Sequence, residues 1–210
     1  MQNAGAVTLY GIPVSSYVWS ARIALAEKGV AYELVPNNPN SPEQRAVHPF
    51  GKVPALAHGD VKLFESQAIL RYVDEAFDGP PLQPDDPAGR ALMSQWLSVF
   101  SAYTYPTLVL GIILPRLNPH FQGPVDEVAI AGAVKQGRVQ LELFDKALAK
   151  DGWFSGGRIS LADITLTPIL FYVSHTPEGG ALLDGFGNVA AWRERMGSRA
   201  SVQKSAPMPG

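Results

Sequence analysis

The chain has 210 residues, a formal net charge of −2 and a hydrophobic content of 46%. That content can fill a packed core, and the near-neutral charge excludes a general electrostatic attraction to nucleic acid or to an anionic membrane. The chain contains no cysteine, which excludes disulfides, thiolate metal sites and a cysteine nucleophile.

The first part of the chain alternates between strand and helix patterns. Short β-type runs bounded by glycine or proline predict strands over residues 7–10, 31–35, 53–57 and 61–64. Apolar positions at helical spacing predict helices over residues 16–28, 42–47 and 65–77. The resulting order, β-α-β-α-β-β-α, predicts a mixed α/β domain.

Proline-rich and glycine-rich segments at 79–81 and 84–87 then mark a domain boundary. Beyond this boundary the strand patterns disappear, and helical periods cover residues 89–114, 125–150, 161–174 and 188–196. We therefore expect two domains, an α/β domain over residues 1–80 and an all-helical domain over residues 89–210.

We expect a cytoplasmic protein with no membrane segment. The N-terminus lacks a positive start followed by an apolar run of signal length. The most apolar stretch, residues 106–117, is shorter than the roughly 20 residues that cross a bilayer.

Val53-Pro54, followed by Glu65-Ser66, is the first pattern with chemical meaning. If the Val53-Pro54 bond is cis, the backbone N–H and C=O of Val53 face solvent and can pair with a short peptide. Glu65 and Ser66 open a helix, whose free N–H groups favour a carboxylate, and Glu65 can bind an ammonium group. An ordinary edge strand and helix start would explain the same residues, and spacing alone favours that simpler interpretation.

A second pattern places two hydroxyl groups at the first strand-to-helix turn. Ser15 can donate a hydrogen bond there to a sulfur atom above the helix N-terminus, where the helix dipole also favours a thiolate. The simpler interpretation is that Ser15 or Ser16 only caps the helix, and chemistry alone favours it.

The segments HPFGKVPAL (48–56) and LFESQAILRY (63–72) resemble the glutathione-binding signature of the cytosolic glutathione S-transferases, at the spacing of that family. The resemblance extends over essentially the whole chain. It implies a thioredoxin-like α/β N-terminal domain followed by an all-α helical bundle. It also implies that Val53 pairs with the cysteinyl backbone of glutathione across a cis Pro54. Glu65 and Ser66 would hold the γ-glutamyl end, and Lys52 would donate to the glycyl carboxylate.

Within that family the chain is similar to the serine-using phi and zeta classes, nearest to their bacterial members. Counting back from residues 23–25 implies that Ser15 is the catalytic serine, with Ser16 and Tyr17 as alternatives. The zeta signature has a cysteine where this chain has Tyr17, which weighs against that class.

Other residues have roles that the resemblance implies less specifically. In the helical domain, an aromatic cluster that includes Phe121 leads us to expect Tyr103, Ile112 and Arg116 in a pocket for the electrophile. Phe50 either anchors the partner subunit of a homodimer or packs within its own chain. His48 can assist the glycyl end, although a lone loop histidine is more often solvated. Ser160 and Asp163 predict a helix capping box with a structural role.

We therefore predict a glutathione transferase that acts in detoxification. It would conjugate reduced glutathione to small apolar electrophiles through a thiolate stabilised by Ser15, as a homodimer and without a metal. Two alternatives stay open. One is a glutathione-binding interaction protein without catalysis, and the other is a glutathione-dependent isomerase or dehalogenase.

Overall fold

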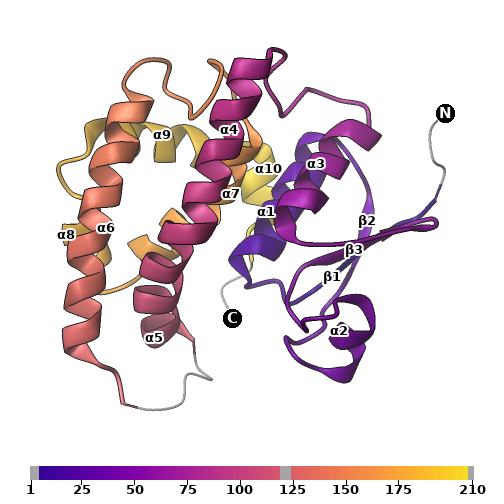
Figure 1. The fold of residues 1–210 in the computed structure, drawn as a ribbon, viewed down its shortest axis with the longest axis horizontal. Coiled ribbons are helices and arrows are strands. Elements are labelled where there is room, and N and C mark those ends of the chain that lie inside the picture. Colours follow the sequence, from indigo (N-terminus) through magenta and orange to yellow (C-terminus); the bar gives the residue numbers. More distant parts are fainter. Residues whose placement is uncertain (1–4, 119–123, 208–210) are drawn as a thin grey trace. The chain divides into compact units, whose positions relative to one another are not determined.

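A computed structural model describes residues 5–118 and 124–207, which fall into two compact units. The first unit contains the described residues up to Gln83 together with those from Ser198 onward, and the second is Pro84–Gly197. Figure 1 labels most of their elements. Phe121, which we expected in the aromatic cluster, lies outside the described residues.

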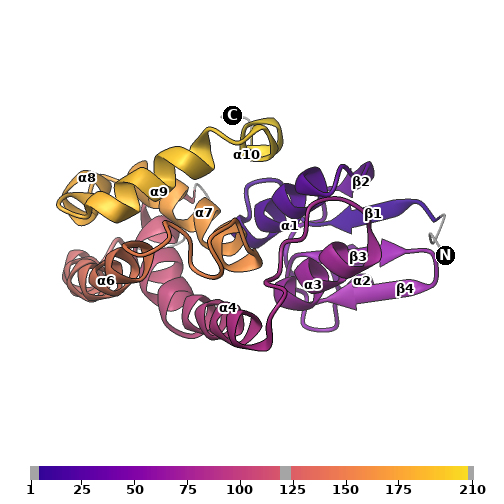
Figure 2. The same ribbon diagram turned by 90° about the horizontal axis from the view of Figure 1, so that it is seen from above.

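The first unit is built on a four-stranded sheet in the order β2-β1-β3-β4 (Figure 2). β1 runs parallel to β2 and antiparallel to β3, which pairs antiparallel with β4. The strands are β1 (Val7–Tyr10), β2 (Tyr32–Val35), β3 (Ala55–His58) and β4 (Val61–Phe64). The helices are α1 (Ser16–Glu27), α2 (Pro42–Val47), α3 (Ser66–Ala76) and α10 (Ala200–Ser205). The predicted β-α-β-α-β-β-α order is confirmed.

Helix α1 supplies the centre of this unit. It packs against α3 and α10, and its Trp19 and Ile23 side chains are fully buried. The indole Nε1 of Trp19 donates to Ser205 Oγ in α10 at 3.0 Å. These contacts hold the last helix against α1, so the described residues from Ser198 onward belong to the first unit. We had expected all of residues 89–210 to belong to the second domain.

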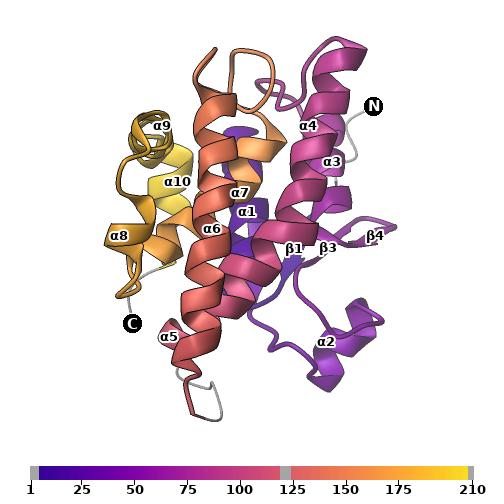
Figure 3. The ribbon, with the colours of Figure 1, turned by 60° about the vertical axis from the view of Figure 1, so that its left-hand side comes forward.

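The second unit is helical throughout its regular elements. They are α4 (Pro87–Val99), η1 (Phe100–Ile113), α5 (Leu114–Leu117), α6 (Glu127–Leu148), α7 (Leu161–Ser174), α8 (Gly179–Leu183) and α9 (Gly187–Gly197). Helix α7 is buried along most of its length, among α4, η1, α8 and α9 (Figure 3). Trp96, Phe100, Phe144 and Phe154 pack edge to face or stacked beside it, with ring centroids 5.1–6.0 Å apart.

Residues Pro87–Leu117 form one continuous helical path through α4, η1 and α5. The π-helical segment η1 contains Pro106, which lacks the N–H that a regular helical ladder requires. The path is 31 residues long and apolar enough to cross a membrane by length and composition alone. Core helices pass the same test, and η1 packs against α6 and α7 in this unit.

Asp163 closes the start of α7 as the predicted capping box. Its Oδ2 accepts hydrogen bonds from the Ser160 N–H at 2.9 Å and from Ser160 Oγ at 2.6 Å. Its Oδ1 accepts from Trp192 Nε1 at 2.8 Å and from the Phe154 N–H at 3.3 Å. Complete burial raises the pKa of Asp163 to about 6 against these hydrogen bonds, so the carboxylate is ionised at neutral pH. The structural role that we predicted for this residue is confirmed.

Candidate functional site

The predicted site residues of the first unit meet where β1 ends. Gly11 follows β1 with a φ of +140°. A Cβ atom added there would lie 2.6 Å from Val18 Cγ2, in the first turn of α1, and 2.9 Å from Val53 Cβ. A glycine is therefore required for this close approach. It brings the segment that carries Ser15 beside the segment that carries Val53.

The Val53-Pro54 peptide bond is cis, as predicted. The ladder between β1 and β3 pairs Tyr10 with Ala55, so Val53 lies just outside the sheet. Among the described residues, none hydrogen-bonds to the backbone N–H or C=O of Val53. A donor and an acceptor are therefore available side by side for an extended peptide.

The segment before Val53 is fixed by a buried amide that we did not predict. Gln44 of α2 is 0% exposed, and its Nε2 donates to the Lys52 carbonyl oxygen at 2.6 Å. The Gly51 carbonyl accepts from the Asn40 N–H at 2.7 Å, which ties the same segment to the loop after β2. Lys52 is thus held by its backbone while its side chain is exposed. Nothing in the sequence indicated the role of Gln44, because a buried polar residue in a short helix cannot be distinguished by pattern from an exposed one.

Glu65 and Ser66 mark the start of α3. Ser66 is the first helical residue and is half-buried, and the exposed Glu65 precedes it with φ 71° and ψ 117°. A residue other than glycine in this region carries a backbone strain of order 1–3 kcal/mol, and such strain clusters at ligand sites. The Glu65 side chain makes no capping hydrogen bond. The Glu65 side chain therefore does not occupy the helix N-terminus, where N–H groups can bind a carboxylate.

Ser15 is the N-cap of α1. Its Oγ accepts a long hydrogen bond of 3.5 Å from the Val18 N–H, and within the described ranges no group accepts the Ser15 hydroxyl proton. This half-buried hydroxyl can therefore donate to a ligand at the helix N-terminus. By contrast, Ser16 is only 7% exposed, and Tyr17 is half-buried.

His48 is buried rather than solvated, so that expectation was wrong. It is 2% exposed, its ring lies 5.0 Å from that of Phe64, and its Nδ1 accepts from the Phe50 N–H at 3.3 Å. Burial lowers the pKa of His48, against a smaller opposing effect of Glu65. The ring of Phe50 is 65% exposed at the rim of this cluster, which argues against a core role for it within the chain.

The three residues that we expected to line an electrophile pocket belong to the second unit. Tyr103 is 64% exposed and Ile112 is fully buried. Arg116 donates to Glu127 at 2.6 Å and to Glu178 at 2.8 Å, so its guanidinium already joins α5 to α6 and to the start of α8. Tyr103 is the residue of the three whose side chain is open to a ligand.

No group of three or more histidine, aspartate and glutamate side chains suited to a metal ion occurs within residues 5–118 and 124–207. The geometry of the first unit instead assembles backbone groups, a helix start and a hydroxyl. These suit a small peptide that carries a nucleophile.

Two family models match the chain. The N-terminal domain of glutathione S-transferases matches residues 9–81, and the C-terminal domain matches residues 127–195. Glutathione S-transferase F10 of Arabidopsis thaliana is 31% identical over 202 residues, which cover 93% of this chain and 94% of that protein. Glutathione S-transferase 1 of Zea mays is 32% identical over 95% of each chain.

Solved structures agree with these matches. Poplar glutathione transferase F1 superposes with a TM-score of 0.88 at 28% identity, covering 96% of this chain and 97% of its own. A theta-class enzyme of Xanthomonas axonopodis pv. citri, solved with glutathione bound, has a TM-score of 0.84 at 29% identity, covering 98% of this chain and 99% of its own. The sequence relatives named above are plant proteins, whereas we expected bacterial ones.

Proposed function

Since the chain belongs to the glutathione S-transferase family, and its activity is that of a glutathione transferase, we propose that Ser15 stabilises the thiolate of bound glutathione. The free hydroxyl proton of Ser15, at the N-terminus of α1 and beside the Val53 segment, is the observation that supports this role. The proposal places the chain with the serine-using members of the family.

Glutathione would bind along the first unit in an extended form. Its cysteinyl N–H and C=O would pair with the free backbone groups of Val53, next to Pro54, as an added strand does. Its γ-glutamyl carboxylate would accept from the N-terminus of α3 and the Ser66 hydroxyl, and Glu65 would bind the ammonium group. Lys52 would face the glycyl carboxylate as a point charge.

In this position the glutathione sulfur lies near the start of α1. A free thiol has a pKa of about 8.5 and is mostly protonated at neutral pH. A hydrogen bond from Ser15 and the positive end of the helix dipole both favour the thiolate. After the proton leaves to solvent, the sulfur attacks the electrophilic carbon, a carbon–sulfur bond forms, and the leaving group departs with the bonding electron pair.

The electrophile, the assembly and the location follow as expectations. We expect a small apolar electrophile in contact with Tyr103, since that side chain is exposed. We expect a homodimer in which the exposed Phe50 inserts into the partner. A cytoplasmic location fits an enzyme that uses reduced glutathione. No observation favours a non-catalytic binding protein, an isomerase or a dehalogenase.

The substitution Ser15→Ala tests the proposal. We expect glutathione affinity to stay within a few fold while turnover of a chloro-nitroaromatic substrate falls at least about tenfold, because thiolate stabilisation is lost but the binding contacts remain. Steady-state kinetics at saturating glutathione measures this change. Ser16→Ala is the matched control and should retain turnover; wild-type turnover in Ser15→Ala would assign the role to another group.

A further inference from the structure

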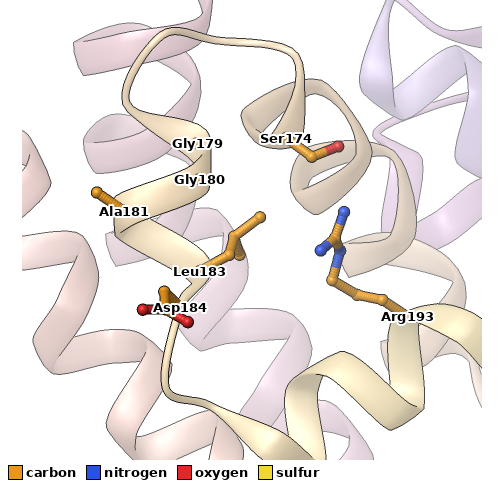
Figure 4. A pocket seen from close by; sticks show the side chains of 7 residues that line it. All are labelled: Ser174, Gly179, Gly180, Ala181, Leu183, Asp184 and Arg193. Atoms are coloured by element: carbon orange, nitrogen blue, oxygen red, sulfur yellow. The ribbon is translucent and has the colours of Figure 1, made fainter.

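A pocket lies in the second unit, at α7, α8 and α9 (Figure 4). It has a volume of about 430 Å³, which is within the range of small-molecule sites. Ser174, Gly180, Leu183, Asp184 and Arg193 contribute to its lining. None of these residues takes part in the glutathione site or in the expected electrophile pocket.

Arg193 is the first unusual feature of this pocket. It is half-buried, and no described residue pairs with its guanidinium. The other arginines of the described part of this unit all have acceptors, namely Arg90, Arg116, Arg138, Arg158 and Arg195. Burial lowers the pKa of Arg193, although a guanidinium stays charged at neutral pH. An unpaired, partly desolvated cation destabilises a fold unless a ligand compensates for it.

Asp184 carries the opposite charge at the edge of this pocket. It is an exposed residue of the lining, and its carboxylate has no partner among the described residues. Arg138 passes close by, but it donates to backbone carbonyls of Ala181, Leu182 and Asp184 rather than to this carboxylate. Figure 4 shows the Leu183 side chain between Asp184 and Arg193, so the two opposite charges flank the pocket without meeting.

Two adjacent glycines, Gly179 and Gly180, belong to the lining of the pocket. A Cβ atom added to Gly179 would lie 2.1 Å from the Val173 carbonyl oxygen, so α8 approaches the end of α7 as closely as a glycine permits. A Cβ atom added to Gly180 would meet nothing within 4 Å. Position 180 is exposed and belongs to the lining, so a side chain added there starts in open space beside the pocket.

We propose that this pocket binds a small zwitterion, with its carboxylate on the Arg193 guanidinium and its ammonium group on the Asp184 carboxylate. Arginine binds a carboxylate through two parallel hydrogen bonds. The negative charge of Asp184 disfavours a simple anion, and the positive charge of Arg193 disfavours a simple cation. Leu183 offers apolar contact to the carbon atoms between the two charged groups. A free amino acid and the γ-glutamyl end of a peptide share this chemistry.

Amide NMR spectra of the full chain test the proposal. L-alanine, a zwitterion, and γ-glutamylglycine, whose γ-glutamyl end is zwitterionic and whose glycine adds a second carboxylate, are titrated to millimolar concentrations. Acetate and methylamine are the probes that carry only one of the two charges. We expect the zwitterions to shift the Gly179 and Gly180 signals with saturation, and the single-charge probes to bind at least about tenfold more weakly. The zwitterion that saturates at the lower concentration identifies the source of the ligand. An equal response to acetate, or no response to either zwitterion, overturns the proposal.

Two variants separate binding from folding. Gly180→Leu should abolish the shifts by filling the pocket, whereas Gly132→Leu should preserve them, because position 132 of α6 is equally unobstructed but lies outside the pocket. Arg193→Met should abolish binding without lowering the midpoint of thermal unfolding, since the guanidinium has no partner to lose. A clear drop in that midpoint would show that Arg193 has a structural role, and would overturn the proposal.

Discussion

Glu65 combines a strained backbone with an exposed side chain at the start of α3. Such a conformation is retained where it orients groups toward a ligand. Asn40 has a similar φ of 64°, but asparagine tolerates that region and this residue is held by Gly51 and Arg45. The strain at Asn40 is thus explained by its loop contacts, whereas the strain at Glu65 supports the proposed role of that residue in binding.

Glu65→Gly should relieve the strain and weaken the ligand site in the same protein. We expect the free energy of unfolding to rise by about 1 kcal/mol, while retention on immobilised glutathione falls, because the proposed partner of the ammonium group is lost. Urea unfolding and a glutathione affinity column measure the two effects. Asn40→Gly is the control and should leave retention unchanged; full retention of Glu65→Gly would remove Glu65 from the binding site.

Site residues that belong to a short contiguous sequence pattern could be predicted, whereas residues whose role depends on contacts between separate segments could not. The cis bond before Pro54 and the helix start at Ser66 were predicted, because each belongs to a short contiguous pattern. Gln44 was missed because its function arises from burial and from a bond to a carbonyl eight residues away. His48 was misjudged because it is covered by Phe64 of β4, which lies outside the loop pattern around His48.

A salt bridge between Arg199 and Glu27, as well as packing, holds α10 against α1. Arg199 donates to both carboxylate oxygens of Glu27 at 2.7 Å, and Ser201 also donates to Glu27. Burial alone would raise the pKa of Glu27, but these hydrogen bonds outweigh it and lower the pKa below 4.5. A lowered pKa means that the folded state favours the charged form. The resulting stability is present above pH 4.5 and is lost as the pH falls through the folded pKa.

Glu27→Gln should therefore make folding stability less dependent on pH in the acidic range. We expect the variant to be less stable than the wild type at pH 7, with a difference that narrows as the pH falls below 4.5, because only the wild type loses this contact on protonation. Thermal unfolding at a series of pH values measures the difference. Glu33→Gln, at an exposed position of β2, provides the control; a difference that stays constant with pH would contradict the assignment.

The capping box at the start of α7 should contribute more to the free energy of unfolding than the contact at Glu27 does. Asp163→Ala should lower the free energy of unfolding by more than about 3 kcal/mol, because it leaves several buried donors without an acceptor. Chemical denaturation measures the loss. Asp151→Ala, at a surface position near the end of α6, should change stability by less than about 0.5 kcal/mol; equal effects of the two substitutions would contradict the role of Asp163.

Across the chain, periodicity was sufficient for the order of the elements but not for the assignment of every segment to a unit. The four strands and the helices α1, α3, α6 and α7 follow from patterns within 4–22 residues. The return of α10 to the first unit depends on Trp19 and Ser205, which are 186 positions apart. The pocket at Arg193 likewise arises from three separate helices, so no contiguous motif indicated it.

The pKa of the thiol of bound glutathione tests most directly whether Ser15 stabilises the thiolate. Ultraviolet absorbance of the thiolate is followed against pH with saturating glutathione, in the wild type and in Ser15→Ala and Ser16→Ala. We predict a midpoint at least about one unit below the free value of 8.5 in the wild type and in Ser16→Ala, and a return toward that value in Ser15→Ala. An identical midpoint in wild type and Ser15→Ala would contradict a role for this hydroxyl in stabilising the thiolate.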